Sequence, residues 1–349
     1  MENKLTAKAF TMNVLNGIAL GAVVVLIPGA LLSELVKSLV TSLPFLKPLV
    51  WGLGMSNSVM GLVCGVMVGM NFKFNPIQSA SLGLATLFAS GAISAKNGMI
   101  MMQGTGDIIN MMITAAIGAG LILLVGNSLK AYTILVIPPL MMLVVGLIGR
   151  FLLPYVSMIT KLIGIGVAQL LTLQPLMMCI LLAIVFGLLI VSPITTVGIA
   201  LAISLTGIGS GAANVGICAT GFGFAILGWS VNTHGTAIAH FIGSPKISMP
   251  VWVKNPKTLL PIVCSAAACG MLAYFFNIQG TPMSAGFGFS GLVGPINHLN
   301  LVKGGWSAMN LLSTLLVFIG GPVAFGFFFK HLFMNVLHLI KPEDYKLDI

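Results

Sequence analysis

The chain has 349 residues, of which 58% are apolar and only 6% are charged, whereas about a quarter of the residues in an ordinary soluble domain are charged. This composition excludes a soluble globular protein and predicts an all-α polytopic membrane protein. The formal net charge of +10 comes from cations that stand singly between apolar runs, so we expect the lipid bilayer and its anionic headgroups as partners and no nucleic acid.

Ten apolar runs are long enough for membrane-spanning helices of about 20 residues each. The run near 10–32 follows a basic N-terminus as in a signal peptide, but it is long and lacks a clear cleavage site, so we expect it to stay in the mature protein as the first span. The other nine spans are predicted near 49–71, 77–96, 107–128, 131–150, 174–192, 194–211, 213–231, 258–277 and 306–330.

Positive charges indicate the orientation, because cytoplasmic loops carry an excess of Lys and Arg. Ten spans and a cytoplasmic N-terminus place three groups of lysines in the cytoplasm, including the loop 241–257 and the C-terminus. These lysines are Lys4, Lys8, Lys246, Lys254, Lys257, Lys330, Lys341 and Lys346. We therefore expect a multi-pass protein with both termini in the cytoplasm.

Two segments differ from simple spans. The segment 151–173 carries Lys161 and Gln169 among apolar residues, which favours an amphipathic interfacial helix that connects an N-terminal half, 1–150, to a C-terminal half, 174–349. The segment 278–305 is apolar but interrupted by glycines and prolines. It predicts a re-entrant hairpin that lines a site, because irregular backbone at membrane depth needs protein or water around it.

The sequence GFGF occurs twice, at 221–224 and at 286–289. Glycines at 207–216 favour close helix packing, yet the first tract is followed by a polar run and the second by Asn297 and His298. The repeat is open to two interpretations: a packing device or chance, or two broken elements that present similar Asn and His tips to one cavity.

Few side chains are suited to chemistry. Asp107 is the acidic residue closest to the membrane interior, and we prefer to interpret it as the N-cap of the fourth span rather than as part of a proton relay. His234, His240 and His298 are then the pH-responsive candidates. The cysteines lie mostly inside apolar runs and are expected to be small buried hydrophobes. No catalytic constellation, metal site or cofactor site is predicted.

Three stretches carry a resemblance to a known family: NTHGTAIAH at 232–240, GSPKISMPVWVKNPK at 243–257, and GTPMSAGFGFSGLVGPINH at 280–298. Together with the pattern of spans, they resemble the membrane-embedded IIC permeases of the bacterial phosphoenolpyruvate-dependent sugar phosphotransferase system. The chain is most similar to the stand-alone IIC-like branch that includes perfringolysin O regulator proteins.

The resemblance implies a homodimer in the bacterial plasma membrane, with the N-terminal half as dimerisation scaffold and the C-terminal half carrying the solute. It also implies separate IIA and IIB partner proteins. We expect the solute, a sugar or related metabolite, to meet neutral hydrogen-bonding groups, with Trp229 or Trp306 stacking on its ring. The candidate substrate-binding residues are Asn232, His234, Thr236, Ser284, Asn297 and His298.

The sequence departs from the family at one point. Sugar-binding members usually place a glutamate in the second hairpin, and 278–305 contains none. Two functions therefore stay open: a permease for a small polar solute, or a non-transporting membrane sensor that binds a solute and signals through the loop 241–257.

Overall fold

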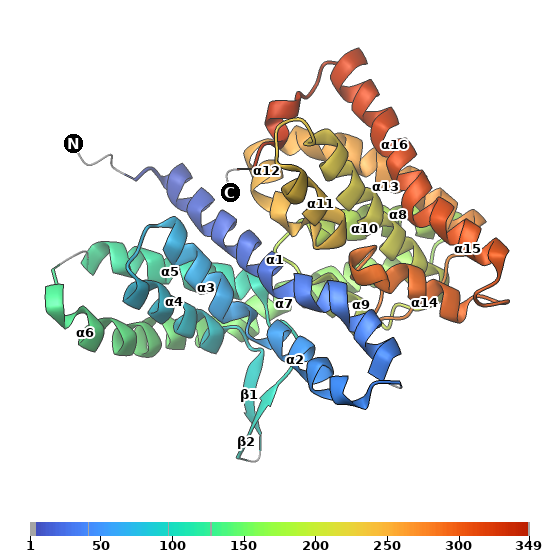
Figure 1. Cartoon of the computed structure of the whole chain (residues 1–349). Helices are drawn as coiled ribbons and strands as arrows, with labels where there is room; N and C mark the ends of the chain where they lie inside the picture. The colour runs from blue at the N-terminus through green and yellow to red at the C-terminus, as the bar shows by residue number, and fades with distance from the viewer. Residues whose placement is uncertain (1–4, 41, 97, 126–127, 348–349) are drawn as a thin grey trace. The chain divides into compact units, whose positions relative to one another are not determined.

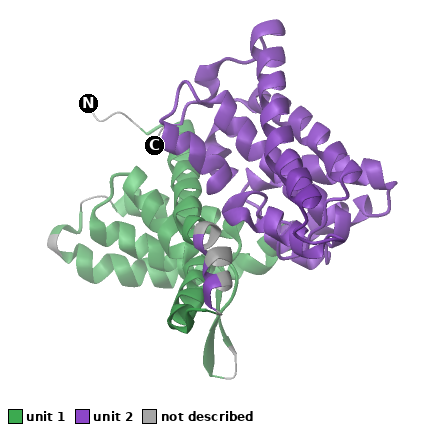
Figure 2. Cartoon of the chain, turned by 45° about the vertical axis from the view of Figure 1, so that its right-hand side comes forward, with its two compact units in different colours: residues 1–29, 42–159, 349 green, residues 30–41, 160–348 purple. Residues whose placement is uncertain are grey.

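The computed structural model describes residues 5–40, 42–96, 98–125 and 128–347. Within these ranges the chain is helical apart from loops and one antiparallel hairpin, β1 (Ile93–Lys96) and β2 (Met99–Met102). It divides into two compact units: unit 1 comprises residues 1–29, 42–159 and 349, and unit 2 comprises residues 30–41 and 160–348 (Figure 2). The predicted all-α class is confirmed.

Six described helices are long and apolar enough to cross a membrane. A seventh crossing is obtained if the bent pair Pro44–Ser58 and Met60–Asn71, at 54° to each other, forms one span. The six are Ala7–Pro28, Ile108–Val125, Thr133–Leu170, Gly207–Leu227, Pro256–Phe275 and Ala308–Val336. The structure thus has the helices of a polytopic membrane protein, and the described residues do not confirm the predicted count of ten crossings.

Unit 1 is built on close contacts between small residues. On α3, a Cβ at Gly65 would lie 2.7 Å from the Cα of Gly83 on α4, so the two backbones touch. A Cβ at Gly21 on α1 would likewise lie 2.5 Å from the Cα of Cys64 on α3. The elements of this unit are the first part of α1 (Ala7–Val40), α2 (Lys47–Ser58), α3 (Met60–Asn71), α4 (Pro76–Ala89), the β-hairpin, α5 (Ile108–Val125), α6 (Thr133–Leu140) and the first part of α7 (Leu147–Leu170).

The span predicted at 77–96 is wrong at its C-terminal end. Helix α4 begins with a capping box between Asn75 and Gln78 and ends at Ala89, after which the chain enters β1. Its 14 residues rise only about 21 Å, less than the roughly 30 Å of the hydrocarbon core. Asp107 does cap α5, because its carboxylate accepts a hydrogen bond from the Asn110 amide at 2.9 Å, as predicted.

The helix predicted as a span at 131–150 extends beyond residue 150 in the structure. Helix α6, a π-helical turn at Met141–Gly146 and α7 continue without interruption from Thr133 to Leu170. Pro138 and Pro139 near the end of α6 remove two amide donors, and a wider π turn is one way for a helix to absorb such a defect. Lys161 and Gln169 therefore lie in the distal part of this continuous helix.

Unit 2 is arranged around α10 (Gly207–Leu227), which packs against α8 (Pro175–Ile190), α13 (Leu259–Phe275) and α16 (Gly321–Lys330) (Figure 1). Every α10 residue from 209 to 227 is buried. A Cβ at Gly211 or Gly216 would overlap the backbone of Ile278 or Ala183, which confirms that the glycines serve close packing. The other helices are α9 (Thr196–Ala202), α11 (His234–Ile242), α12 (Met249–Lys254), α14 (Val293–Leu301) and α15 (Ala308–Leu315).

Three expectations fail in unit 2. The span predicted at 194–211 is only the seven-residue α9, because the chain breaks at Ser204 and Gly207, which both have positive φ. The first Gly-Phe tract is not a broken element, since α10 is a regular helix through Leu227. The segment 241–257, predicted as a loop, instead folds into short helical turns, in which residues 243–251 are all buried. Four of the five cysteines are buried, as predicted.

Candidate functional site

The chain between α13 and α14, residues 277–292, forms what we call the broken segment. It is irregular apart from one short turn at Ser290–Leu292, and Gly288, Gly291 and Leu292 all have positive φ near +60°. Its start pairs with the beginning of α10 through two backbone hydrogen bonds of 3.0 Å between Gly207 and Gly280. The irregular backbone predicted here is confirmed.

Buried polar side chains of α9 and α10 satisfy the backbone of the broken segment. The Thr196 hydroxyl donates to the Gly286 carbonyl at 2.9 Å, and the Ser210 hydroxyl donates to the Thr281 carbonyl at 2.8 Å. The side-chain oxygen of Asn214, Oδ1, accepts from the Gly288 backbone amide at 3.0 Å. Because buried irregular backbone needs such partners, these side chains hold the segment inside the helix bundle.

The two Gly-Phe tracts touch each other. Phe222 of the first tract meets Phe289 of the second edge-on, with ring centroids 5.5 Å apart, and stacks on Phe241 of α11 at 4.4 Å. The Ser290 hydroxyl donates to the carbonyls of Ile242 and Gly243 at the end of α11. The broken segment is thus joined to both α10 and α11.

Two predicted site residues border the broken segment directly. Ser284 is buried, and its hydroxyl accepts from the Thr281 amide at 2.9 Å. His298 on α14 is fully buried, and its Nδ1 accepts from the Gln279 amide at 3.0 Å. Asn297 is next to His298 and half-buried. We refer to Thr196, Ser210, Asn214, Ser284 and His298 as the hairpin cluster.

The other three predicted residues lie beyond the C-terminal end of α10. The Asn232 amide donates to the Tyr345 carbonyl at 2.9 Å, and its oxygen accepts from the Leu347 amide at 2.9 Å. His234 is exposed and stacks on Trp229 with ring centroids 4.9 Å apart. The Thr236 hydroxyl hydrogen-bonds that of Thr233 at 2.8 Å.

The structure does not bring all six predicted residues together. Asn214, which contacts Ser284, and Gly228, which contacts Asn232, are separated by a helix rise of about 21 Å along α10. Ser284 and His298 therefore belong to one group, with Asn297 beside it, whereas Asn232, His234 and Thr236 belong to another. The Asn232 side chain is already occupied in anchoring the C-terminal residues.

A buried histidine and a buried lysine were not expected from the sequence. His240 shares a 2.7 Å hydrogen bond with Ser248, and burial lowers its pKa to about 4. Lys246 donates to the carbonyls of Ser192 and Ile194 at 2.7 and 2.8 Å, and burial lowers its pKa to about 7. Lys246 is therefore not an exposed loop cation but a side chain that ties two loops together.

The histidine expectation also needs correction. Burial lowers the pKa of His298 to about 4, as for His240, so both rings are neutral at physiological pH. Of the three predicted pH-responsive histidines, only His234 is exposed. Ser210 and Asn214 were not predicted as site residues. The sequence signal that could have identified them is a polar side chain inside an apolar helix.

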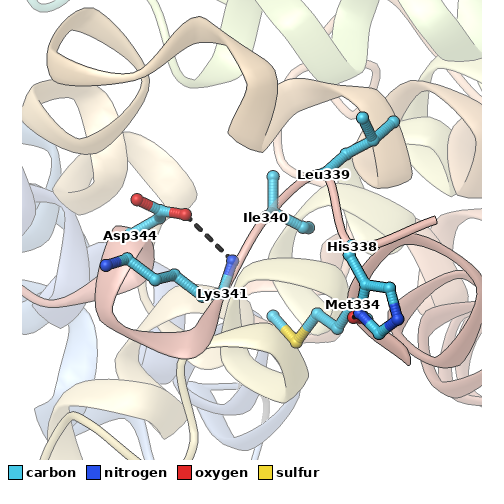
Figure 3. A pocket seen from close by; sticks show the side chains of 6 residues that line it. All are labelled: Met334, His338, Leu339, Ile340, Lys341 and Asp344. Carbon is cyan, nitrogen blue, oxygen red and sulfur yellow. Dashed lines mark hydrogen bonds between the residues drawn. The ribbon is translucent and has the colours of Figure 1, made fainter. Parts of the chain in front are cut away.

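A separate surface pocket of about 350 Å³ lies near the C-terminus (Figure 3). The Lys341 amide donates to Asp344 at 2.9 Å across one of its edges. None of the six predicted site residues lines it; the lining residues are Met334, His338, Leu339, Ile340, Lys341 and Asp344. Over the part of the chain that the structure describes, no group of three or more His, Cys, Asp or Glu residues is placed to hold a metal.

Comparison with known proteins agrees with the resemblance. The family model described as "Phosphotransferase system, EIIC" matches residues 12–347. No curated protein and no solved structure matches the chain. Because the family model covers nearly the whole sequence, including the hairpin cluster, the chain belongs to the EIIC family of phosphotransferase-system membrane permeases.

Proposed function

We propose that the protein carries a small polar solute, a sugar or related metabolite, across the bacterial plasma membrane. The observation that supports this most is the broken segment, whose irregular backbone is buried at residues 284–286 and 288 and hydrogen-bonded there and at Thr281 by polar side chains of unit 2. Transporters build their solute sites from such discontinuous elements, and irregular backbone at membrane depth occurs where it is enclosed by protein or lines a cavity.

The proposed solute contacts are neutral hydrogen-bonding groups. His298, Ser284 and Asn297 lie at or beside the broken segment, and His234 with Trp229 forms an exposed stacked pair. Amide, hydroxyl and imidazole groups suit sugar hydroxyls, and an indole suits a ring face. Asn232 and Thr236 belong with His234 to the second of the two groups, on the α11 side beyond the end of α10, and the proposed set includes them there.

The proposal extends to assembly. Residues 1–150 would form the dimer scaffold of a homodimer and residues 174–349 would carry the solute, joined through the end of α7. Separate IIA and IIB proteins would supply the phosphoryl group if the solute leaves phosphorylated. The cations at both ends of the chain favour cytoplasmic termini.

A second candidate is a sensor that binds the solute without moving it. One observation favours it: the residues 278–305 contain no carboxylate to polarise a sugar hydroxyl. The buried segment 243–251, tied to the 191–194 loop by Lys246 and Trp252, would then transmit the bound state.

The test is uptake of radiolabelled glucose, N-acetylglucosamine and cellobiose by the purified protein in liposomes, with and without IIA, IIB and phosphoenolpyruvate. His234→Ala and Asn297→Ala should each weaken half-saturation about two- to tenfold, the range for loss of one neutral hydrogen bond. Asn300→Ala, on the same helix as Asn297 but exposed and bonded to Trp306, is the matched control.

The outcomes separate the two functions. Binding of a sugar without uptake under either condition would support the sensor and contradict transport. Uptake that neither substitution changes would contradict the proposed contacts while leaving transport intact. Uptake only with phosphoenolpyruvate and both partner proteins would indicate coupling to phosphorylation.

A further inference from the structure

The two ring nitrogens of His298 are in different situations. Nδ1 lies 3.0 Å from the backbone nitrogen of Gln279. A backbone amide can only donate a hydrogen bond, so Nδ1 must be the accepting, unprotonated nitrogen. Nε2 is buried and has no hydrogen-bond partner among the described residues.

This arrangement determines the tautomer. A neutral imidazole carries one proton, and since Nδ1 accepts, the proton is on Nε2. In a cationic ring, the proton on Nδ1 would face the Gln279 amide proton, and the two donors would repel each other instead of forming a hydrogen bond. Burial of the ring, which lowers its pKa to about 4, acts in the same direction. His298 therefore presents a neutral N–H donor.

Three acceptors around the broken segment already accept hydrogen bonds from the chain itself. The Ser284 oxygen accepts from the Thr281 amide at 2.9 Å and lies 3.4 Å from the Asn214 amide nitrogen. The Asn214 oxygen accepts from Gly288, and the Thr281 carbonyl accepts from Ser210. A buried donor without a partner is destabilising, so the Nε2 proton is left for an acceptor from outside the chain.

We propose that the Nε2–H group of His298 donates a hydrogen bond to an oxygen atom of the carried solute, such as a sugar hydroxyl or ring oxygen. The inference rests on the proposed function and deepens it, because it requires an acceptor at this point of the solute. In the described conformation His298 is fully buried, and Phe318, on the π-helical turn Leu316–Gly320, lies with its ring centroid 6.4 Å from that of the imidazole. The solute reaches the Nε2–H group when Phe318 moves away from His298. Phe318 lies on a π turn, and such turns are frequent at functional sites.

Two substitutions divide the roles of the ring. In His298→Asn, the side-chain oxygen takes the place of Nδ1 and can accept from Gln279, but no donor remains at Nε2. In His298→Gln, the amide nitrogen reaches the Nε2 position and restores the donor. With the same three radiolabelled sugars, we expect His298→Asn to weaken half-saturation about tenfold, the upper end of the range for one neutral hydrogen bond, at nearly unchanged thermal stability. His298→Gln should stay within about threefold of the wild type in half-saturation, at lower thermal stability.

A second measurement reads the ring itself. In histidine-labelled protein, ¹⁵N NMR spectra of the wild type minus those of His298→Asn should show a protonated Nε2 and an unprotonated Nδ1. Addition of a carried sugar should shift the Nε2 signal. A protonated Nδ1 would overturn the inference. Equal uptake by wild type and His298→Asn would also overturn it, because the Nε2–H group would then donate to an internal water rather than to the solute.

The outcomes distinguish this inference from the proposed function. A sugar-induced Nε2 shift without uptake would support the donor and contradict transport. Uptake together with an unresponsive Nε2 would contradict the donor alone. If no sugar is taken up and none shifts the signal, both are overturned.

Discussion

The two Gly-Phe tracts have the same four residues and different structures. Residues 221–224 continue the regular helix α10 and are buried on all sides. Residues 286–289 lie in the broken segment, where Gly288 has a φ of +61°. The two tracts nevertheless meet through Phe222 and Phe289. The repeat therefore joins a helix to an irregular segment, and it does not form two similar broken elements.

The difference follows from what flanks each tract. Around the first tract, α10 has no proline and its backbone bonds stay within the helix. The second tract follows Pro282, and its backbone finds partners on other elements, through Thr196 and Asn214. A four-residue motif therefore has no conformation of its own; the available hydrogen-bond partners decide it.

Alanine at the second glycine of each tract should give the largest contrast. At Gly288 an alanine must adopt a left-handed conformation and place its Cβ 2.5 Å from Ile217, costing about 2–4 kcal/mol. At Gly223 the Cβ would meet only the flexible end of Ile262, and alanine favours a helix by about 1 kcal/mol, so the net change should stay within about 1 kcal/mol. Thermal unfolding in detergent measures both, and equal losses would contradict the assigned conformations.

Removing the Asn214 side chain should have the next largest effect. Asn214→Ala leaves the Gly288 amide of the second tract without an acceptor, which costs about 1–3 kcal/mol when buried. Ser81→Ala is the control, because the buried Ser81 hydroxyl bonds only a carbonyl of its own helix. If the two variants unfold at the same temperature, the second tract does not depend on α10.

Acidification tests the surroundings of the first tract, where His240 lies parallel to Phe224 with ring centroids 6.1 Å apart. Its folded pKa of about 4 lies below the ordinary value of 6.5, so the unfolded state binds more protons. Stability is then constant above about pH 7 and falls as the pH drops from 6.5 toward 4, by about 1–2 kcal/mol at pH 5.

The buried His298 ring contributes to this fall in the same direction. Stability measured in detergent from pH 8 to pH 5 should therefore decline less in His240→Gln than in the wild type. Parallel pH profiles for the two proteins would show that His240 is not neutral in the fold.

The smallest expected effect is the direct coupling between the tracts. A double-mutant cycle of Phe222→Leu and Phe289→Leu should give a coupling of about 0.5–1.5 kcal/mol for the edge-on ring pair. Phe325 and Phe329, whose ring centroids are 6.4 Å apart, provide a comparison pair. A cycle that closes to zero would mean that the tracts are only neighbours.

Local signals in the sequence were sufficient to predict part of the fold and part of the candidate site. Hydropathy predicted the helical membrane protein, the carboxylate before an apolar run predicted the Asp107 cap, and glycines with prolines predicted the broken segment. Ser284 and His298 were predicted as site residues because they fall within or next to that segment. Each of these features depends on neighbours a few residues away.

Tertiary structure decided the rest. The contact between Asn214 and Gly288 spans 74 residues, and the bond from Asn232 to Tyr345 spans 113. Such pairings bury Lys246, occupy the Asn232 amide and leave His298 Nε2 without a hydrogen-bond partner among the described residues. The sequence gives the type of each side chain. Which buried group forms a hydrogen bond with it depends on segments that meet only when the chain has folded.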